Sequence, residues 1–294
     1  MKEKAYAQLY SIVRQEREGH LEAFRRFAEI GYDGVELLGN NTNGLSFEDY
    51  KKYLKDLGLK AIASHNLHND EDYDFAAKLG LKYDIVAGCD AVRDEEKLKR
   101  ICEEWNQIGR HLEAFGMKAV IHNHGEEFCW MNEEKKEKRI YDYIAENTDP
   151  KTVGFELDVG WVVRAGLDPV EYITRYAGRV PLIHIKECAY PAKDFEDLEH
   201  FPSRVLQMGE PKIVNGVPYF TEEQKQILND SRKWNVELGK GIVDFRAIVD
   251  AAEAQGCEAY VNEREYYQLA SVPDGDPVKC AALDYAYLRS LEER

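Results

Sequence analysis

The chain has 294 residues, of which 44% are hydrophobic and 32% are charged, enough for a large core and a polar surface. An excess of 55 acidic over 39 basic residues gives a formal net charge of −16, which would repel a nucleic-acid backbone. No apolar run approaches the roughly 20 residues of a membrane span, and the first ten residues lack the layout of a signal peptide. We therefore expect a cytoplasmic protein with no nucleic-acid partner and no membrane association.

Short β-type runs alternate with helical segments along the chain. One helix is indicated by apolar residues spaced three and four apart from Leu98 to Phe115, and Gly116 is expected to end it. Two more helices are expected to begin at the Asp-Pro pairs 168–169 and 276–277, where the aspartate caps free N–H groups. Eight strands are expected, at residues 5–10, 33–38, 60–65, 84–88, 118–124, 152–158, 180–186 and 258–263.

Eight strand-helix units without a low-complexity linker predict one (β/α)8 TIM barrel over residues 1–294. A doubly wound open sheet is the alternative, but it gives no reason for polar residues to recur at the strand ends. Residues 190–236, after the seventh strand, form a longer connection than a barrel needs. We expect this insertion to be a lid over the barrel mouth or a contact surface for a partner. The six cysteines show no CxxC pair, so we expect them to be reduced and mostly buried.

Polar residues gather where the last four predicted strands end. In a (β/α)8 barrel these C-terminal ends form the active face. A single buried histidine or aspartate is more often structural, but four strands that deliver such residues to one rim favour a metal site. The residues are His122 and His124, then Glu156 and Asp158, then His184 and Lys186, and last Glu263. Imidazole and carboxylate together suit Mn²⁺, Zn²⁺ or Co²⁺.

Several motifs resemble the xylose isomerase-like barrels, a superfamily that includes sugar phosphate isomerases/epimerases and enzymes similar to inosose dehydratase and 3-dehydroshikimate dehydratase. The motifs are GYDGVELL (31–38), HNHGEEF (122–128), FELDVGWVVRAGLDPVEYI (155–173), GRVPLIHIKE (178–187), VELGKGIVDF (236–245) and EAYVNERE (258–265). The resemblance implies a divalent ion, with Mn²⁺ first and Zn²⁺, Co²⁺, Fe²⁺ or Mg²⁺ as alternatives. It also implies that Asp158, His184 and Glu263 are ligands.

The fourth ligand of this superfamily is commonly a glutamate on strand five, whereas the matching position here holds His122. His124 and Glu127 are the other strand-five alternatives. A glutamate there would be the second of two bases that pass a proton across the substrate. A metal-bound imidazole cannot accept a proton through the nitrogen that binds the metal, so elimination, which needs one base and one acid, gains weight.

The predicted function is that of a metal-dependent carbohydrate isomerase or epimerase that transfers a proton next to a carbonyl. The alternatives are a dehydratase or lyase on the same scaffold, acting on an inosose or a keto-glycoside, and a partner-dependent or non-catalytic sugar-binding subunit. The family also implies a possible homo-oligomer. Whether the sugar is phosphorylated stays open.

Individual roles follow from these alternatives. Glu263 is expected to be ligand and base together, and His124 or His65 the acid. Lys186 is expected either to neutralise an oxyanion or to form a salt bridge with Glu156. Substrate contacts are expected from Glu36, Trp161 and Arg264, with Glu36 and His65 alternatively orienting a metal ligand.

Overall fold

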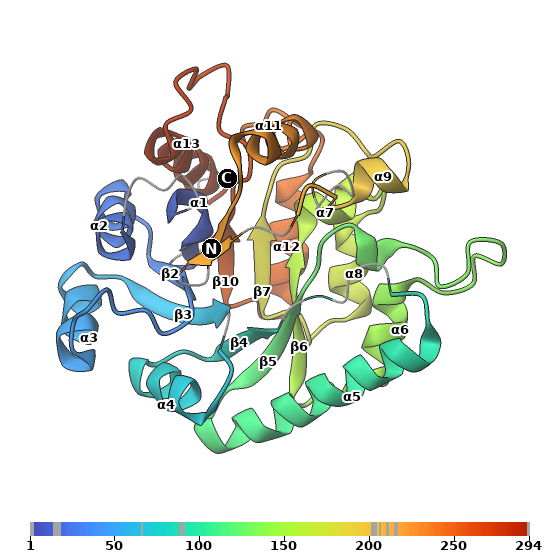
Figure 1. Ribbon diagram of the computed structural model, residues 1–294, viewed down its shortest axis with the longest axis horizontal. Helices are drawn as coiled ribbons and strands as arrows, with labels where there is room; N and C mark the ends of the chain where they lie inside the picture. Colours follow the sequence, from blue (N-terminus) through green and yellow to red (C-terminus); the bar gives the residue numbers. More distant parts are fainter. Residues whose placement is uncertain are drawn as a thin grey trace.

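The computed structural model describes residues 3–13, 19–65, 67–86, 88, 92–200, 205, 207–209, 212–214 and 217–292. Its central feature is a closed parallel barrel of eight strands in the order β1-β10-β7-β6-β5-β4-β3-β2, surrounded by helices (Figure 1). The predicted (β/α)8 fold is therefore confirmed. The barrel strands are β1 (Ala5–Gln8), β2 (Gly34–Leu38), β3 (Lys60–His65), β4 (Tyr83–Val86), β5 (Lys118–His122), β6 (Val153–Asp158), β7 (Leu182–Ile185) and β10 (Ala259–Asn262).

The helices begin and end where the sequence chemistry indicates. Asp168 and Asp276 each cap a helix, with side chains that accept from the backbone N–H groups of Val170 and Val278. The α-helices are α1 (Tyr10–Val13), α2 (His20–Ile30), α3 (Phe47–Asp56), α4 (Asp70–Leu79), α5 (Glu95–Leu112), α6 (Ile140–Asn147), α7 (Val159–Arg164), α8 (Pro169–Arg175), α9 (Phe195–Leu198), α11 (Glu222–Ser231), α12 (Phe245–Ala254) and α13 (Pro277–Ser290). Among the described helices, none is long and apolar enough to cross a membrane.

The predicted strands exist, but several end earlier than expected. β5 ends at His122, so the expectation that the strand runs on through His124 is wrong. The 3-10 turn η2 (Glu126–Phe128) follows directly. The predicted helix from Leu98 to Phe115 is α5 plus a final 3-10 turn, and Gly116 ends it in the left-handed conformation with φ 71°. The interior of the barrel holds a compact apolar cluster made of Tyr6, Ile62, Ala63, Tyr83, Ile85, Val120, Leu182, Ala259 and Val261.

The predicted insertion, 190–236, contains α9, the antiparallel pair β8 (Lys212–Val214) and β9 (Val217–Tyr219), and α11. Residues 201–204, 206, 210, 211, 215 and 216 of it lie outside the described part of the chain. α9 and α11 lie at the end of the barrel toward which β6 and β7 point (Figure 1). Leu198 of α9 packs on the loop after β5, where a Cβ on Gly125 would lie 2.5 Å from its Cδ1. α9 and α11 of the insertion therefore lie on the mouth side of the barrel, and the role of the insertion as a lid stays a prediction.

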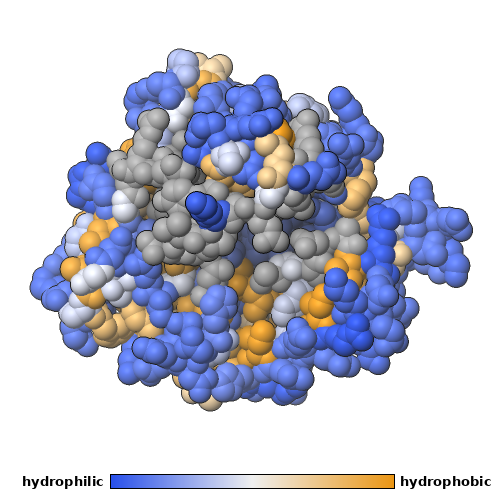
Figure 2. Space-filling view, in the orientation of Figure 1, coloured by the Kyte–Doolittle hydropathy of each residue, from blue (hydrophilic) through white to orange (hydrophobic). Residues whose placement is uncertain are grey.

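The described cysteines are reduced, and one face of the protein is mostly polar, as the composition indicates. Among the described residues, Cys102, Cys129, Cys188, Cys257 and Cys280 are free and buried, and Cys89 lies outside the described part of the chain. Most of the face seen in Figure 2 is hydrophilic, as a chain with 32% charged residues requires.

Candidate metal centre and active site

Four side chains of metal-ligand type meet at the mouth of the barrel. His122 ends β5, Asp158 ends β6, His184 lies on β7, and Glu263 follows β10. Each offers one ligand atom, and these atoms all lie within 4.8 Å of one another. All four side chains are buried. These are the four residues that the sequence and the family resemblance brought forward as ligands.

The two histidines of this set are each held by a carboxylate. His122 Nδ1 lies 3.2 Å from Glu156 Oε2, and His184 Nε2 lies 3.2 Å from Glu36 Oε1. His122 therefore has Nε2 left for an ion, and His184 has Nδ1. A carboxylate on the far nitrogen fixes the tautomer and the ring orientation, as in many metal-bound histidines.

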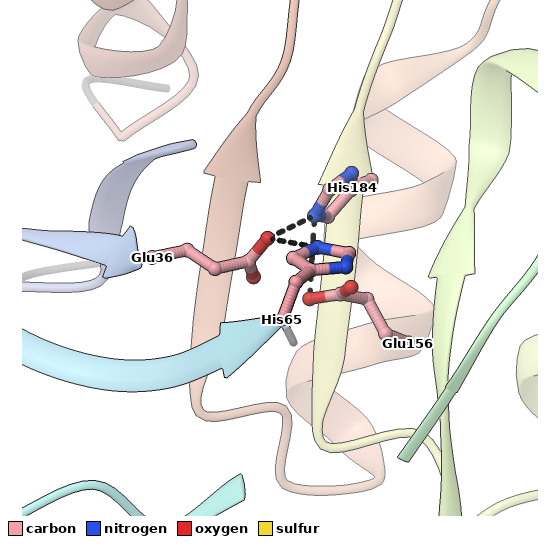
Figure 3. A group of neighbouring side chains, drawn as sticks. All are labelled: Glu36, His65, Glu156 and His184. Carbon is pink, nitrogen blue, oxygen red and sulfur yellow. Dashed lines mark hydrogen bonds and ion pairs between the residues drawn. The ribbon is translucent and has the colours of Figure 1, made fainter. Parts of the chain in front are cut away.

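Glu36 belongs to a second polar group deeper in the barrel, with His65, Glu156 and His184 (Figure 3). Glu36 Oε1 lies 2.9 Å from His65 Nε2, and Glu156 Oε1 lies 3.3 Å from His184 Nε2. Burial alone would raise the pKa of Glu36, but the neighbouring imidazoles of His184 and His65 lower it strongly. The two carboxylates of this group contact both histidines of the first set: Glu156 lies next to His122 and His184, and Glu36 lies next to His184. This arrangement is suited to orienting the two rings.

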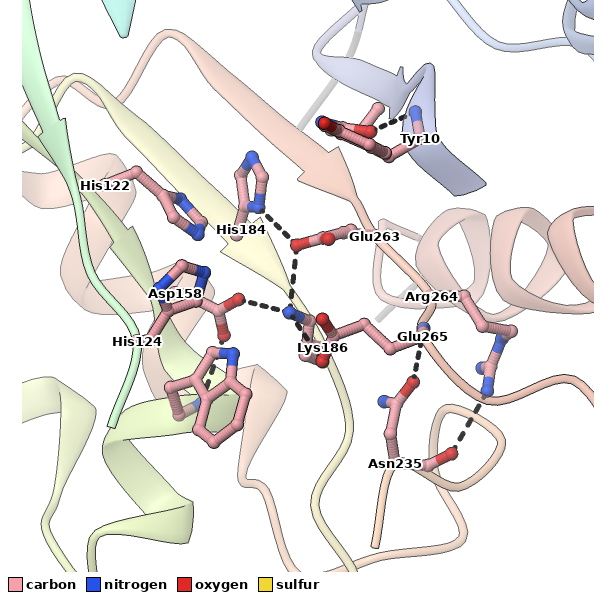
Figure 4. Close-up of polar contacts among 12 residues, drawn as sticks. Tyr10, His122, His124, Asp158, His184, Lys186, Asn235, Glu263, Arg264 and Glu265 are labelled. Atoms are coloured by element: carbon pink, nitrogen blue, oxygen red, sulfur yellow. Dashed lines mark hydrogen bonds and ion pairs between the residues drawn. The ribbon is translucent and has the colours of Figure 1, made fainter. Parts of the chain in front are cut away.

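Lys186 lies between two of the candidate ligands and is fully buried (Figure 4). Its Nζ is 2.8 Å from Asp158 Oδ2, 2.9 Å from Glu263 Oε2 and 3.5 Å from Glu265 Oε2. The alternative prediction, a salt bridge from Lys186 to Glu156, is wrong. Lys186 follows the end of β7, so its ammonium lies level with Asp158 at the mouth, while Glu156 contacts the histidines deeper in the barrel.

Glu265 was missed by the sequence reasoning. It follows Glu263 by two residues in the EAYVNERE motif, and this spacing was the available signal. Its side chain is buried, and its Oε1 lies 3.6 Å from both His200 Nδ1 and Arg232 Nε.

The pKa values of the two histidines are shifted in opposite directions. Burial, with the nearby His184 charge, lowers the pKa of His122 to about 3, so this imidazole is neutral and competent as a ligand. Burial would also lower the pKa of His184, but the carboxylates of Glu156 and Glu36 raise it well above the ordinary value. Burial raises the pKa of Asp158 to about 6, although the ammonium of Lys186 opposes this shift.

The charge balance of the site fits a bound cation. Five buried carboxylates lie in or beside the site: Asp158, Glu263 and Glu265 contact Lys186, Glu265 also lies near Arg232, and Glu36 and Glu156 contact histidines. Buried charges are costly unless they are paired or bind a metal. The spacing also fits, because two ligands about 2.0–2.1 Å from a tetrahedral ion lie about 3.3 Å apart. His184 Nδ1 and Glu263 Oε2 are 3.2 Å apart.

Aromatic rings border this centre on the mouth side. The His124 ring lies 5.0 Å from the ring of His122 and 5.8 Å from that of Trp161. Trp161 is buried beneath Lys186, whose Nζ is 5.6 Å from its ring, and contacts Trp234 edge to face at 4.6 Å. Its indole Nε1 has no hydrogen-bond partner among the described residues.

Two predicted site residues point elsewhere. Glu127 Oε2 accepts from the backbone N–H of His124 at 2.9 Å, and its Oε1 packs against Gly88. It is therefore outside the four-ligand set. Arg264 is buried and donates from Nε to Asp284 on α13 at 2.7 Å, and its Nη1 reaches the carbonyl of Val236 at 3.2 Å. Its guanidinium is thus paired with a carboxylate of α13. This arrangement does not support the predicted contact of Arg264 with substrate.

Known proteins resemble the chain in sequence and in fold. An inosose dehydratase of Clostridium perfringens (strain 13 / Type A) is 27% identical over 242 residues, which is 82% of this chain and 66% of that protein. An inosose dehydratase of Geobacillus kaustophilus is 28% identical over 54% of this chain. The chain spans about half of the length of that second relative, 52%.

Solved structures share the fold. A sugar phosphate isomerase/epimerase of Parabacteroides distasonis superposes with a TM-score of 0.70 at 23% identity, over 98% of this chain and 93% of the other. The IOLI protein, in a structure with a bound zinc atom, superposes with a TM-score of 0.64 at 15% identity, over 98% and 97%. The model of one family, described as the xylose isomerase-like TIM barrel, matches residues 24–290. The chain therefore belongs to the xylose isomerase-like TIM barrel family.

Proposed function

We propose that this protein is a divalent-metal-dependent lyase that removes a proton next to the carbonyl of a keto-sugar or cyclic polyol ketone and eliminates a neighbouring hydroxyl. His122, Asp158, His184 and Glu263 would hold the ion, and Mn²⁺ is the first choice for this set of imidazoles and carboxylates. When bound, the ion would polarise the carbonyl oxygen and acidify the adjacent C–H bond. The other steps fall to side chains of the chain itself.

The asymmetry of the acid-base groups carries this proposal. Glu263 is a carboxylate next to the mouth, and it is the expected base, through the oxygen that does not bind the ion. The residue on strand five, where a second base would be expected, is His122. Its Nδ1 contacts Glu156, and its Nε2 would bind the ion. No second carboxylate is therefore available at strand five to return the proton to the opposite face of the substrate. Elimination needs only one base and one acid.

Lys186 is the acid that the arrangement favours. Its Nζ lies 2.9 Å from Glu263 Oε2, so the donor and the base share one edge of the site. Burial would lower the pKa of Lys186, but Asp158, Glu263 and Glu265 raise it, so the amine is protonated and has a proton to give to a departing hydroxyl. Isomerisation or epimerisation is the second candidate, because both begin with the same proton removal and Lys186 would then return a proton to the substrate.

The charges around the site favour an uncharged substrate. Lys186 lies between carboxylates, Arg264 is paired with Asp284, and Arg232 Nε lies 3.6 Å from Glu265. A phosphate would add negative charge to a cluster that already has a carboxylate surplus. The names of the inosose dehydratase relatives point the same way, since an inosose carries hydroxyls and a ketone but no phosphate.

The test combines metal exchange with product analysis. The protein is stripped with EDTA, reloaded with Mn²⁺, Co²⁺, Zn²⁺, Fe²⁺ or Mg²⁺, and incubated in D₂O with inososes, keto-sugars and keto-glycosides. We expect metal-dependent loss of the α-proton signal in the NMR spectrum and an absorbance from an unsaturated ketone. Deuterium incorporation without elimination would instead establish the isomerase or epimerase. A metal-bound protein that binds these compounds but exchanges no proton would overturn both and favour a sugar-binding subunit.

A further inference from the structure

A cavity lies at the end of the barrel opposite the candidate metal centre. Its volume is about 580 Å³, and it is lined by residues at which strands begin: Lys60 is the first residue of β3, and Lys82 and Glu258 directly precede β4 and β10. The four-ligand set lies where strands end, so the two places are on opposite faces of this parallel barrel. Small-molecule sites span about 300–1,000 Å³, so the cavity has the size of a ligand pocket.

The charge of the cavity is opposite to that of the whole protein. Its charged lining residues are four lysines and one glutamate, whereas the chain has a formal net charge of −16. A local surplus of positive charge attracts anions, even on a protein that repels them elsewhere. The lysines are Lys51, Lys55, Lys60 and Lys82.

Two of these lysines have no carboxylate partner. Lys60 and Lys82 each pair with a glutamate. Lys51 Nζ instead donates to a backbone carbonyl of α4 at 2.6 Å, which leaves its charge uncompensated. In the described part of the chain, no carboxylate forms an ion pair with Lys51 or Lys55. The two residues are four apart on α3 and so project from the same side of that helix.

The inner wall of the cavity is apolar and contains one unsatisfied hydroxyl. Ile62 and Tyr6 line the cavity and belong to the apolar cluster inside the barrel. Tyr6 is only 5% exposed, and its hydroxyl has no hydrogen-bond partner among the described residues. Burial, together with nearby carboxylates, raises the pKa of Tyr6 to about 12, so the phenol keeps a proton to donate. Buried hydroxyls are usually hydrogen-bonded, and a ligand in the cavity would supply the acceptor.

We propose that this cavity binds a phosphorylated small molecule with a planar ring, the chemistry of a nucleoside di- or triphosphate. The ammonium groups of Lys51 and Lys55 would contact the phosphates, because lysine is a common phosphate ligand. The ring would pack on the apolar wall, and Tyr6 would donate to the ligand. The substrate proposed for the mouth is uncharged, so this ligand is a different molecule, and the inference does not depend on the proposed function.

The test is calorimetric titration of the metal-loaded protein with ATP. We expect saturable binding that weakens as the salt concentration rises. Lys55→Gln should weaken it about tenfold, since one charge-assisted contact is lost. The matched control is Lys52→Gln, because Lys52 lies on the same helix but pairs with Asp56 and does not line the cavity. Its affinity should stay within about twofold of wild type. Equal weakening by the two variants, or titration without saturation, would overturn the proposal.

Three further measurements identify where and how ATP binds. Tyr6→Phe removes only the hydroxyl and should weaken binding about fivefold, and unchanged binding would overturn the role of Tyr6. Tripolyphosphate has no ring and should bind more weakly than ATP, so equal binding would overturn the role of the apolar wall. Asp158→Asn alters the metal centre and should bind ATP as wild type does. Loss of binding in Asp158→Asn would assign the phosphates to the metal centre and overturn the basal site.

Discussion

The barrel interior has an apolar layer and, two residues further along each of three strands, a layer of ionisable side chains. Val120 precedes His122 on β5, and Leu182 precedes His184 on β7. Val261 of β10 likewise precedes Glu263. The first member of each pair lies in the apolar cluster, and the second lies in the four-ligand set. Side chains two apart on a strand share a face, so the two layers lie one above the other.

The difference shows where stability and function reside in this fold. Burying a large aliphatic side chain contributes about 1.5–3 kcal/mol. Burying carboxylates and imidazoles costs free energy unless each is paired. The lower layer thus stabilises the barrel, and the upper layer is retained despite its cost, which is expected at the active face.

The largest expected effect comes from removing one carboxylate of the upper layer. Asp158→Asn keeps an oxygen to accept from the backbone N–H of Trp161, as Asp158 does now at 3.1 Å, but loses the charge. We expect the variant to retain no metal after dialysis and to have turnover at background, while its melting temperature stays near that of wild type. Elemental analysis and thermal denaturation measure the two results.

The control for Asp158→Asn lies one layer below. Leu182→Ala should destabilise the fold by about 2–5 kcal/mol while keeping wild-type metal content, because it leaves a cavity in the apolar cluster. Metal retained by Asp158→Asn, or lost from a folded Leu182→Ala protein, would contradict this division between the layers.

A second prediction concerns a carboxyl outside the ligand set. Burial raises the pKa of Asp84 on β4 to about 7, whereas an unfolded aspartate titrates near about 4. The folded state therefore holds a proton that the unfolded state releases, and stability is lost as the pH rises from about 4 to 7. Asp84→Asn should equal wild type near pH 4 and exceed it at pH 8 by up to about 4 kcal/mol. Urea titrations at the two pH values measure the free energy of unfolding of both proteins. A difference between the two proteins that is the same at both pH values would refute the prediction.

The smallest predicted effect tests the deeper polar group. Glu156→Gln removes the carboxylate that holds His122 Nδ1, although an amide oxygen can still accept from the ring. We expect metal affinity to fall about 10- to 100-fold, as for other partners of metal-bound histidines. Competition with a fluorescent chelator measures the affinity. No change would mean that Glu156 does not orient the ligand.

The sequence predicted the barrel because period-two strands and helical spacing alternate, and this local pattern is what a (β/α)8 fold requires. It also predicted that polar residues gather at one rim, since residues at the ends of parallel strands converge; that Asp158, His184 and Glu263 are ligands was implied by the family resemblance and stays a prediction. The strand ends were less predictable: His124 looked like a continuation of β5, but the chain turns after His122. The partners of Lys186 and Arg264 were not predictable, because they depend on how far each side chain reaches across the barrel.

The edge-to-face contact of Trp161 with Trp234 gives the protein a built-in optical reporter. The chain has four tryptophans, and one of them lies beneath Lys186 and beside His124, while its neighbour follows α11 of the insertion. Indole emission depends on nearby charges and on solvent. Loading of the centre should therefore change the fluorescence of this pair, so the occupancy of the site can be followed without a label.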